Sequence, residues 1–592
     1  MTRIDPHSYF DDAQPRTTSW HLRLNVDFDR QVLDGEATLL FPKGVQGTLD
    51  LDTRGLTIHR CFVTATNGDI PWELAPEEAI LGRRLRLELP ERCMGVTIAY
   101  ETAPDASGLQ WLAPEQTAGK THPFLFSQCQ AIHARSLVPC QDCAVARVPY
   151  SAEILVPEGM TAVMSAGSKR DEEGPIPGTR LFHFDMPQRI PTYLFALAVG
   201  HLASAELGPR ARVWAEPEVL PRAAWEFEGV EAMIQKAEGL FGPYDWDRFD
   251  MLVLPPSFTY GGMENPRMTF LTPTLLAGDR SLVDVVAHEL AHSWTGNLVT
   301  NATAEHFWLN EGFTVWAERK IKAALFGEDN ALMGWAIGQR ELEQAMARFQ
   351  DQPDLTKLRT HLEGIDPDDA FSSIPYEKGA RLVALMEQTL GEAAFDGFVK
   401  AYMKKFRFKS ITTEQFCAFV EETHPGLLAR VDIDTWLHQP GLPATAPVFR
   451  SPKLEALIAA GEAWASGKRP SEAELKAWVP SELLIFLQHL PRQLSREDLT
   501  WLEATLQLTA RGNHEILVEW LVIAGGSDFE PVFPRIREVL GSVGRMKYVR
   551  PLYAALGHHE RTRALAREIF KSASRTYHGL TCRVAEGVIA AY

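Results

Sequence analysis

The stretch His288-Glu-Leu-Ala-His292 is an H-E-x-x-H motif, and it lies inside a helical pattern that runs from Ser281 to Thr295. Residues four apart on a helix lie about 40° apart on one face, so both imidazoles can reach one metal ion. Glu289 lies beside them on the same helix. The motif alone also fits two histidines that pack in a helix–helix interface, so the sequence around it decides between a metal site and a core.

A second helical pattern, over residues 310–325, follows the motif and places Glu311 19 residues after His292. Two imidazoles and one carboxylate leave an open fourth position on zinc for water, which is typical of catalytic rather than structural zinc. We therefore predict one Zn²⁺ ion per chain, bound by His288, His292 and Glu311. Glu318, on the same helix face as Glu311, is either an acceptor for a ligand histidine or an exposed helical residue.

Outward from this centre the chain changes its periodicity. Residues 1–203 alternate apolar and polar side chains between Gly, Asp and Pro turns, which predicts an all-β domain. Residues 204–438 mix short strands with long helical patterns, which predicts an α+β domain around the metal site. Residues 439–452 carry four prolines and predict an extended linker. Residues 453–592 show successive amphipathic helical patterns and predict an all-α domain of stacked helix pairs.

Length and charge exclude several classes of protein. A chain of 592 residues is several times the size of one cooperative core, which predicts a multidomain protein. The net charge of −18 is spread along the chain, so nucleic acid and anionic membranes are not expected as partners. No stretch approaches the roughly 18 consecutive apolar residues of a membrane span. The chain lacks long coiled-coil or charged segments, which favours a monomer.

The N-terminus and the cysteines bear on the compartment. Residues 1–8 contain no apolar segment of the signal-peptide type, so we expect a cytoplasmic protein. Seven cysteines, an odd number, fit a reduced protein better than a disulfide framework. Cys140 and Cys143 form a C-x-x-C pair, but a second ligand pair and a thioredoxin-like context are not apparent. Ordinary thiols are expected there, and a zinc or redox site is the alternative.

Five separated segments, in order along the chain, together resemble one family. They are Gln128-Cys-Gln-Ala-Ile-His133, Gly261-Gly-Met-Glu-Asn265, the H-E-x-x-H motif with Glu311, Pro375-Tyr-Glu-Lys-Gly379 and Arg545-Met-Lys547. The set resembles the gluzincin aminopeptidases of the leukotriene A(4) hydrolase branch over essentially the whole chain. The resemblance implies a saddle-like N-terminal β domain, a thermolysin-like zinc domain and a C-terminal domain of stacked helices.

The same resemblance implies roles for the central residues. Zinc would polarise the scissile carbonyl and acidify water, and Glu289 would act as general base. Tyr376 would donate a hydrogen bond to the oxyanion. Glu264, helped by the amide oxygen of Gln130, would bind the free α-ammonium of a peptide, which separates an exopeptidase from an endopeptidase. The substrate-binding motif around Glu264 also includes Gly261, Gly262 and Met263. Without the resemblance, this motif is only a turn, and the tyrosine only packs at a helix start.

At the far end, the resemblance makes Arg545 and Lys547 a carboxylate-binding pair, so short peptides, and tripeptides in particular, would be held at both ends. Alone, these residues would be a solvated charge pair. Tyr260 and Phe307 are either walls of the pocket for the first side chain or core residues.

Hydrolysis of a lipid epoxide is the alternative function, because it would use the same zinc site. Asp368 matches the family aspartate that is linked to the lipid reaction and would lie in the substrate site. Phe371 stands where the epoxide-hydrolysing relatives carry a tyrosine, which disfavours the lipid reaction. A scaffold without activity is disfavoured because every residue that the chemistry needs is present. The predicted function is therefore zinc-dependent hydrolysis of N-terminal peptide bonds.

Overall fold

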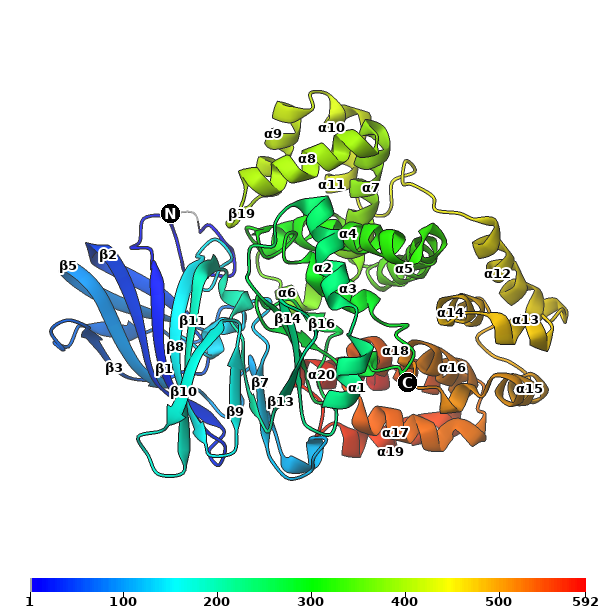
Figure 1. Ribbon diagram of the computed structural model, residues 1–592, viewed down its shortest axis with the longest axis horizontal. Coiled ribbons are helices and arrows are strands. Elements are labelled where there is room, and N and C mark those ends of the chain that lie inside the picture. Colours follow the sequence, from blue (N-terminus) through cyan, green and yellow to red (C-terminus); the bar gives the residue numbers. More distant parts are fainter. Residues whose placement is uncertain (1–2) are drawn as a thin grey trace.

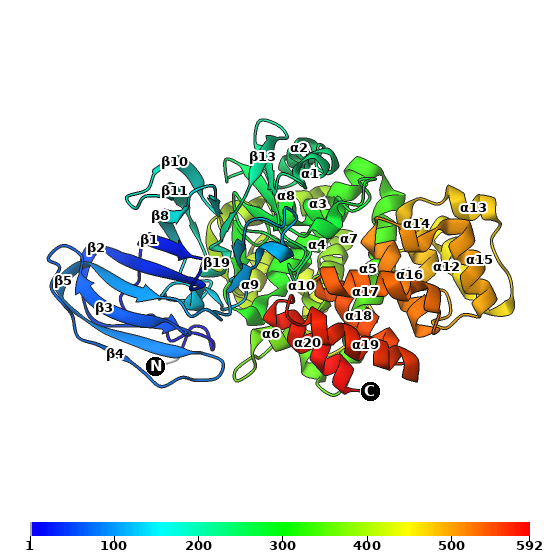
Figure 2. The same ribbon diagram turned by 90° about the horizontal axis from the view of Figure 1, so that it is seen from below.

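A computed structural model describes residues 3–592 of the chain. The predicted β domain begins at Met1, so its first two residues, Met1 and Thr2, lie outside the described residues. The described chain forms a β domain, a central domain of mixed helices and strands, and a helical domain (Figure 1). Turned by 90°, the three parts still follow one another along the long axis, with the central part in the middle (Figure 2). The predicted multidomain α+β architecture is confirmed.

Two β-sheets make up the N-terminal domain. Their strands are β1 (Ser19–Asp27), β2 (Val32–Thr53), β3 (Thr57–Val63), β4 (Trp72–Leu74), β5 (Arg83–Glu101), β6 (Leu109–Leu112), β7 (Phe124–Ser127), β8 (Val148–Pro157), β9 (Thr161–Met164), β10 (Gly167–Glu173), β11 (Thr179–Ile190) and β12 (Leu197–Gly200). One sheet has the order β10-β11-β8-β1-β2-β5-β3, with β4 beside β5, and the other has the order β6-β7-β12-β9. In β1, Leu22 and Leu24 are buried while Arg23 is exposed, because successive strand residues face opposite sides.

The central domain contains a five-stranded sheet and the helices that carry the predicted metal site. Its strands are β13 (Ala203–Glu206), β14 (Ala211–Ala215), β15 (Phe249–Val253), β16 (Gly262–Met263), β17 (Thr269–Leu271), β18 (Val299–Asn301) and β19 (Lys409–Ile411). Its helices are α1 (Leu220–Glu226), α2 (Val230–Phe241), α3 (Asp284–Ala291), α4 (Trp308–Phe326), α5 (Glu328–Arg348), α6 (Pro367–Ala370), α7 (Gly379–Leu390), α8 (Glu392–Lys405), α9 (Thr413–Thr423), α10 (Leu427–Arg430) and α11 (Ile433–His438). The sheet has the order β13-β14-β15-β17-β16. The two predicted helices around the metal site are present as α3 and α4.

The C-terminal domain is entirely helical and follows a stretch without helix or strand at residues 439–451. Its helices are α12 (Pro452–Glu462), α13 (Glu472–Ala477), α14 (Pro480–Gln488), α15 (Arg496–Leu506), α16 (His514–Gly526), α17 (Phe533–Ser542), α18 (Met546–Leu556), α19 (Glu560–Ala573) and α20 (Gly579–Ala590). Ser471 and Ser495 cap α13 and α15 by accepting hydrogen bonds from the backbone N–H groups three residues later. Helices α14, α16, α18 and α20 contact one another in turn, as expected for stacked helices.

The apolar core is not divided as the domains are. One continuous cluster of buried residues runs from Trp20 in β1 to Leu437 in α11, so the β domain and the central domain share a core. The helical domain has its own main cluster, from Trp464 to Ala585. The helical domain is thus the separately packed part. The residue boundaries at 203/204 and around the linker 439–452 stay predictions.

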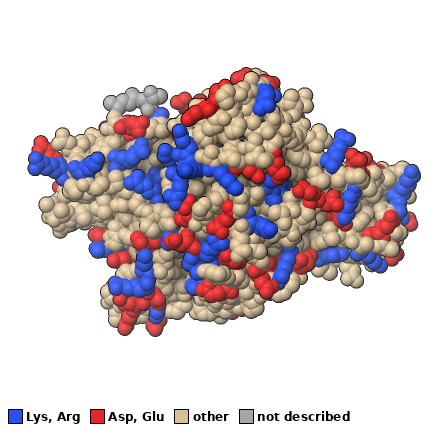
Figure 3. All heavy atoms as spheres, turned by 45° about the horizontal axis from the view of Figure 1, so that its top comes forward, with Lys and Arg blue, Asp and Glu red and all other residues tan. Residues whose placement is uncertain are grey.

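The surface charge and the hydropathy of the helices match what the sequence indicates. Acidic and basic side chains intermingle over the face shown in Figure 3. Among residues 3–592, no helix is both long enough and apolar enough to cross a membrane.

Candidate active site

Helix α3 and its C-terminal cap carry both histidines of the motif. His288 and Glu289 lie in the last turns of α3, and His292 follows the helix as its C-terminal cap. The turn then passes through Gly296, whose φ of +126° favours glycine. A Cβ at Gly296 would lie 2.6 Å from His292 Nδ1, so only glycine lets the chain return this close to the imidazole.

Three ligand-type atoms converge between α3 and α4. The Nε2 atoms of His288 and His292 each lie 3.4 Å from Oε2 of Glu311, and the three ligand atoms lie within 4.8 Å of one another. Among residues 3–592, Oε2 of Glu311 is buried without a hydrogen-bond partner. A buried carboxylate oxygen is rarely left without a donor, and two imidazoles with an acceptor oxygen suit a cation such as Zn²⁺. The residues therefore fit the predicted metal.

The other ring nitrogens of both histidines are held in place. His288 Nδ1 lies 3.2 Å from Oε2 of Glu318, and His292 Nδ1 lies 3.0 Å from the carbonyl oxygen of Thr295. These acceptors put the hydrogen on Nδ1 and leave Nε2 free to bind a metal. Glu318 is buried, and although burial opposes it, the charge of Arg319 lowers the pKa of Glu318 to about 2. Of the two alternatives for Glu318, the structure shows the contact with a histidine.

Glu289 lies against the G-G-M-E-N segment. A Cβ at Gly262 would lie 2.3 Å from Oε1 of Glu289, so the glycine makes room for this carboxylate. Burial raises the pKa of Glu289 to about 8. A dication held by the neighbouring histidines would lower this pKa. A buried carboxyl group whose pKa lies near neutral pH is suited to accept and return a proton.

Glu264 is a second buried carboxylate beside the same histidines. Carboxylate oxygens of Glu264 and Glu289 and a ring nitrogen of His292 lie within 4.8 Å of one another. Oε1 of Glu264 has no hydrogen-bond partner among residues 3–592. Asn297 donates a hydrogen bond of 2.7 Å to the Glu264 carbonyl oxygen and so fixes the backbone at this point. Burial raises the pKa of Glu264, and the charges of Glu311 and Glu289 add to the shift.

Tyr376 lies against His288, one of the predicted metal ligands. It lies in a π-helical turn, Ile374–Lys378, which leads into α7. Its ring stacks on His288 with the ring centroids 6.1 Å apart. Helix α4 approaches this turn because Gly312 and Gly379 touch: a Cβ at Gly379 would lie 2.9 Å from the Gly312 Cα.

The helical domain places its Arg-Met-Lys segment on the G-G-M-E-N loop. Met546 N–H donates to the carbonyl oxygen of Thr259 at 3.0 Å, and Arg545 Nη2 would lie 2.7 Å from a Cβ at Gly261. Arg545 is buried and its Nη1 donates to the hydroxyl of Tyr548 at 2.8 Å. Lys547 is more exposed. Arg545 therefore lies beside Gly261, and the neighbouring Gly262 contacts Glu289, while Lys547 lies at the surface.

Comparisons with known proteins agree with this geometry. Three family domains match successive parts of the chain: "Peptidase M1 N-terminal domain" at residues 14–194, "Peptidase family M1 domain" at 225–436 and "Leukotriene A4 hydrolase, C-terminal" at 478–588. The chain is 39% identical over 587 residues to Leukotriene A-4 hydrolase of Xenopus laevis, which covers 94% of this chain and 95% of that protein.

The chain belongs to peptidase family M1. Leucine aminopeptidase 2 of Yarrowia lipolytica is also 39% identical, over 98% of this chain and 92% of its own length. The solved structure of yeast LTA4 hydrolase in complex with bestatin superposes with a TM-score of 0.91 at 33% identity, covering 99% of this chain and 97% of that chain. The predicted branch of zinc aminopeptidases is thereby confirmed.

A cavity of this M1 enzyme opens beside the proposed centre. Gln130, Tyr260, Phe307, Phe371 and Pro375 line it, together with the segment that leads into α6. Tyr260 and Phe371 meet edge to face with centroids 5.6 Å apart. Of the alternatives for Tyr260 and Phe307, the structure places both side chains in the cavity wall, and Tyr260 also packs against the core.

Asp368 lines the same cavity but is already paired. His133 Nε2 lies 3.0 Å from its Oδ2, and Arg583 Nη2 of α20 lies 3.9 Å away. Although burial opposes it, the hydrogen bond from His133 lowers the pKa of Asp368. The contacts of Asp368 with His133 and Arg583 join the β domain, the central domain and the helical domain at one point.

The sequence of this M1 enzyme did not predict the two acidic partners of Arg545 and Lys547. Lys547 Nζ lies 2.9 Å from Oε2 of Glu515 and 3.1 Å from Oε1 of Glu341. Arg545 Nη1 lies 3.7 Å from Oε1 of Glu515. Glu515 lies in the first turn of α16, two residues after the cap residue Asn513. An acidic residue there is explained by its favourable interaction with the helix N-terminus, and its position in the sequence does not indicate a contact with Arg545.

Within residues 3–592, the two cysteines of the C-x-x-C pair form no disulfide and belong to no candidate metal site. All seven cysteines are free thiols, and Cys140 and Cys143 are buried. Among residues 3–592, the groups able to hold a metal contain no cysteine.

Proposed function

We propose that the protein is a zinc aminopeptidase that removes the N-terminal residue of short peptides. One observation carries the proposal: three buried carboxylates, Glu264, Glu289 and Glu311, surround two histidines, and two of them have oxygens without a donor among residues 3–592. Three carboxyl groups buried so close together can all be ionised only if cations offset their charge. A metal dication and the α-ammonium of a peptide supply that positive charge.

His288, His292 and Glu311 would hold the zinc ion. Zinc bound there would polarise the scissile carbonyl and acidify water. The second metal-capable group, Glu264, Glu289 and His292, shares His292 with the first, which supports one ion per chain.

Glu289 and Tyr376 would carry the proton and the developing charge. Glu289 would take a proton from the attacking water at its carboxylate and pass it to the leaving nitrogen. The Tyr376 hydroxyl would donate a hydrogen bond to the carbonyl oxygen as negative charge develops on it. The stacking of Tyr376 on His288 supports a position opposite the metal ligands.

Glu264 would select the free N-terminus. A buried carboxylate binds an ammonium group strongly through charge-assisted hydrogen bonds, and it would be left unpaired under an acetylated or internal residue. Gln130 would add its amide oxygen, and Gly261, Gly262 and Met263 would let the substrate backbone approach β16. At the other end, Arg545 and Lys547 would bind the carboxylate of a tripeptide.

Hydrolysis of a tripeptide with and without an N-terminal acetyl group tests the proposal. Wild-type enzyme should release the first residue of the free peptide and leave the acetylated one intact, and a chelator should stop the reaction. Equal cleavage of both peptides would contradict an aminopeptidase.

Lipid epoxide hydrolysis is the second candidate, favoured by the relative named Leukotriene A-4 hydrolase. Asp368 lines the cavity, but Phe371 presents no hydroxyl beside Tyr376, and the rings lie 6.0 Å apart. Turnover of an epoxy-fatty acid, measured beside an aminoacyl chromogenic substrate, distinguishes the two functions. We expect the peptide reaction to dominate.

The proposed setting is a monomer in the cytoplasm that acts on peptides rather than on nucleic acid or membranes. The seven free thiols support a reducing compartment.

A further inference from the structure

Most of residues 5–10 are buried, although segments near a chain end are usually poorly ordered unless tied down. Asp5, His7 and Ser8 are 4%, 1% and 0% exposed. Residues 5–10, which we call the N-terminal clasp, precede the first strand and belong to neither sheet. Their burial therefore needs an explanation outside the β domain's own sheets.

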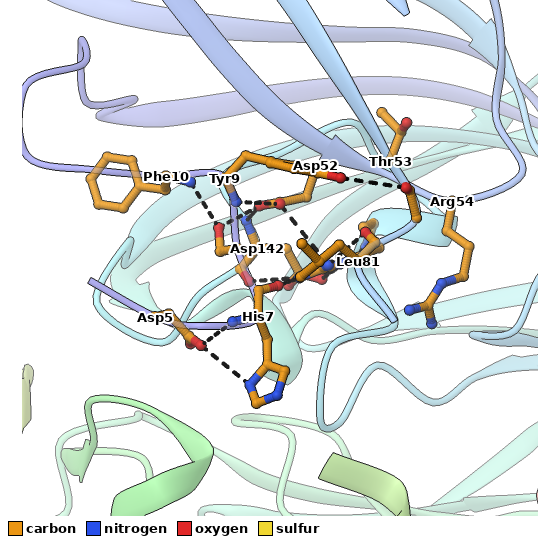
Figure 4. A network of polar contacts seen from close by, with 12 residues as sticks. Asp5, His7, Tyr9, Phe10, Asp52, Thr53, Arg54, Leu81 and Asp142 are labelled. Carbon is orange, nitrogen blue, oxygen red and sulfur yellow. Dashed lines mark hydrogen bonds and ion pairs between the residues drawn. The ribbon is translucent and has the colours of Figure 1, made fainter. Parts of the chain in front are cut away.

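One side of the clasp is fixed to the β domain by a buried polar network (Figure 4). Arg135 Nη2 donates to the carbonyl oxygen of His7 at 2.7 Å, and Arg135 Nε donates to Asp142 at 2.9 Å. Ser8 Oγ and Tyr9 N–H donate to the carboxylate of Asp52 at 2.6 Å and 2.9 Å. Arg135, Asp52 and Asp142 are at most 1% exposed, so the network is shielded from water and its hydrogen bonds are costly to break.

The other side of the clasp reaches into the central domain through one side chain. His7 Nε2 lies 3.0 Å from the carbonyl oxygen of Leu362 and 2.8 Å from that of Ile365. Carbonyl oxygens only accept, so Nε2 must carry a hydrogen. His7 Nδ1 faces Oδ1 of Asp5 at 3.4 Å; although burial opposes it, Asp5 and the two carbonyls raise the pKa of His7.

The segment to which His7 is hydrogen-bonded forms part of the proposed substrate cavity. Residues 357–366, which we call the pocket loop, form neither helix nor strand, so their shape depends on contacts from outside the segment. Leu358 and Leu362 of the pocket loop line the cavity that Tyr260 and Gln130 line beside the proposed centre. Asp5 and His7 line the same cavity.

We propose that the N-terminal clasp, through His7, positions the pocket loop and thereby sets how well large apolar N-terminal side chains of the substrate bind. His7 is a positioning residue, not a catalytic one. The inference rests on the proposed aminopeptidase function. A large side chain gains affinity by burying surface against Leu358 and Leu362, whereas alanine is too short to use this part of the wall.

The side chain at position 7 offers a matched set of variants. His7→Ala removes the donor and leaves two buried carbonyls without it. His7→Gln restores it, because the glutamine amide places an NH₂ group with two hydrogens at a similar reach. His7→Asn keeps a polar side chain that is too short to reach the carbonyls. Lys43→Ala, at an exposed site in β2, is the control.

The measurement is kcat and KM for phenylalanyl- and alanyl-p-nitroanilide, with unfolding midpoints recorded for each variant. For His7→Ala we expect KM for the phenylalanyl substrate to rise about tenfold, the change that a lost buried hydrogen bond typically produces, with kcat and the alanyl substrate nearly unchanged. His7→Gln should return to within about threefold of wild type, and His7→Asn should behave as His7→Ala. Lys43→Ala should match wild type.

The outcomes separate this inference from the function beneath it. If wild type cleaves both substrates but His7→Ala lowers kcat/KM for both substrates equally, His7 contributes only to stability and the inference is wrong. A lower KM for the phenylalanyl substrate would show that His7 merely blocks the cavity, which also overturns it. If His7→Ala does not fold, His7→Asn against His7→Gln gives the same comparison. If wild type cleaves neither substrate, the proposed function fails, and the inference fails with it.

Discussion

The two ends of the proposed substrate site are built in different ways. At the proposed amine end, Glu264, Glu289 and the predicted metal ligands come from one domain that shares a continuous core with the β domain. At the carboxylate end, Arg545 and Lys547 come from the helical domain, which has its own core. The amine end holds carboxylate oxygens without donors among residues 3–592, whereas both cations of the other end already face Glu515.

This difference predicts a gradient of mutational effects. A buried charge without a partner gains most when its ligand binds, because the ligand replaces a missing interaction. A cation that already has a carboxylate partner gains less, because the substrate only shares or replaces that partner. Changes at the amine end should therefore cost more activity than changes at the carboxylate end.

The largest expected effect is that of Glu289→Gln. The change removes the proposed base but keeps all three metal ligands, so kcat should fall by roughly 100- to 10 000-fold while zinc content stays at the wild-type level. Steady-state kinetics and metal analysis measure the two quantities. Glu497→Gln, an exposed site in the first turn of α15, is the control. Activity near wild type would remove Glu289 from the mechanism.

Glu311→Ala should weaken zinc binding rather than remove the general base. Two imidazoles alone do not complete the site, so zinc affinity should fall by more than the roughly 100-fold that outer-shell changes cause. Metal content after dialysis against a chelator measures it. Full occupancy in the variant would show that Glu311 is not a ligand.

Glu264→Ala should weaken substrate binding at the amine. Losing charge-assisted contacts to the ammonium should raise KM for free-amine peptides roughly tenfold to a hundredfold. Inhibitors that carry a primary amine should lose affinity in parallel, and their acetylated forms should not. An unchanged ratio between the two inhibitor types would place the ammonium elsewhere.

Local patterns predicted the candidate metal ligands better than the rest of the molecule. The i, i+4 histidines and the nearby Glu311 lie within one short stretch, so helical periodicity brings them together. His7 and Leu362 are 355 residues apart, and nothing in either local sequence indicates their contact. The ion pair of His133 with Asp368, and the partners Glu515 and Glu341 of Lys547, arise likewise from domain packing. Domain composition predicted the three-domain fold, but not that two domains share one core.

Arg545→Ala should have a smaller and selective effect. We expect about a tenfold loss of kcat/KM for tripeptides, since Glu515 partly offsets the charge of Arg545 in the free enzyme. Aminoacyl-p-nitroanilides carry no carboxylate and should change little. Arg537→Ala, an exposed site in α17, is the control. Equal losses for tripeptides, amidated tripeptides and anilides would show that Arg545 acts through domain packing.

The smallest expected effect is that of Glu515→Gln, and its sign is opposite. Removing this carboxylate frees positive charge on Arg545 and Lys547, so KM for free-acid tripeptides should fall by about threefold. Amidated tripeptides should not respond. A rise in KM for the free acids would mean that Glu515 holds the cations in place more than it competes with the substrate.

The rate of hydrolysis of one tripeptide in its free and N-acetylated forms, measured with and without a chelator, tests the central claim most directly. We predict that only the free peptide is cleaved, that the chelator abolishes cleavage, and that added Zn²⁺ restores it. Cleavage of the acetylated peptide at a similar rate, or cleavage that persists with the metal removed, would contradict a zinc aminopeptidase.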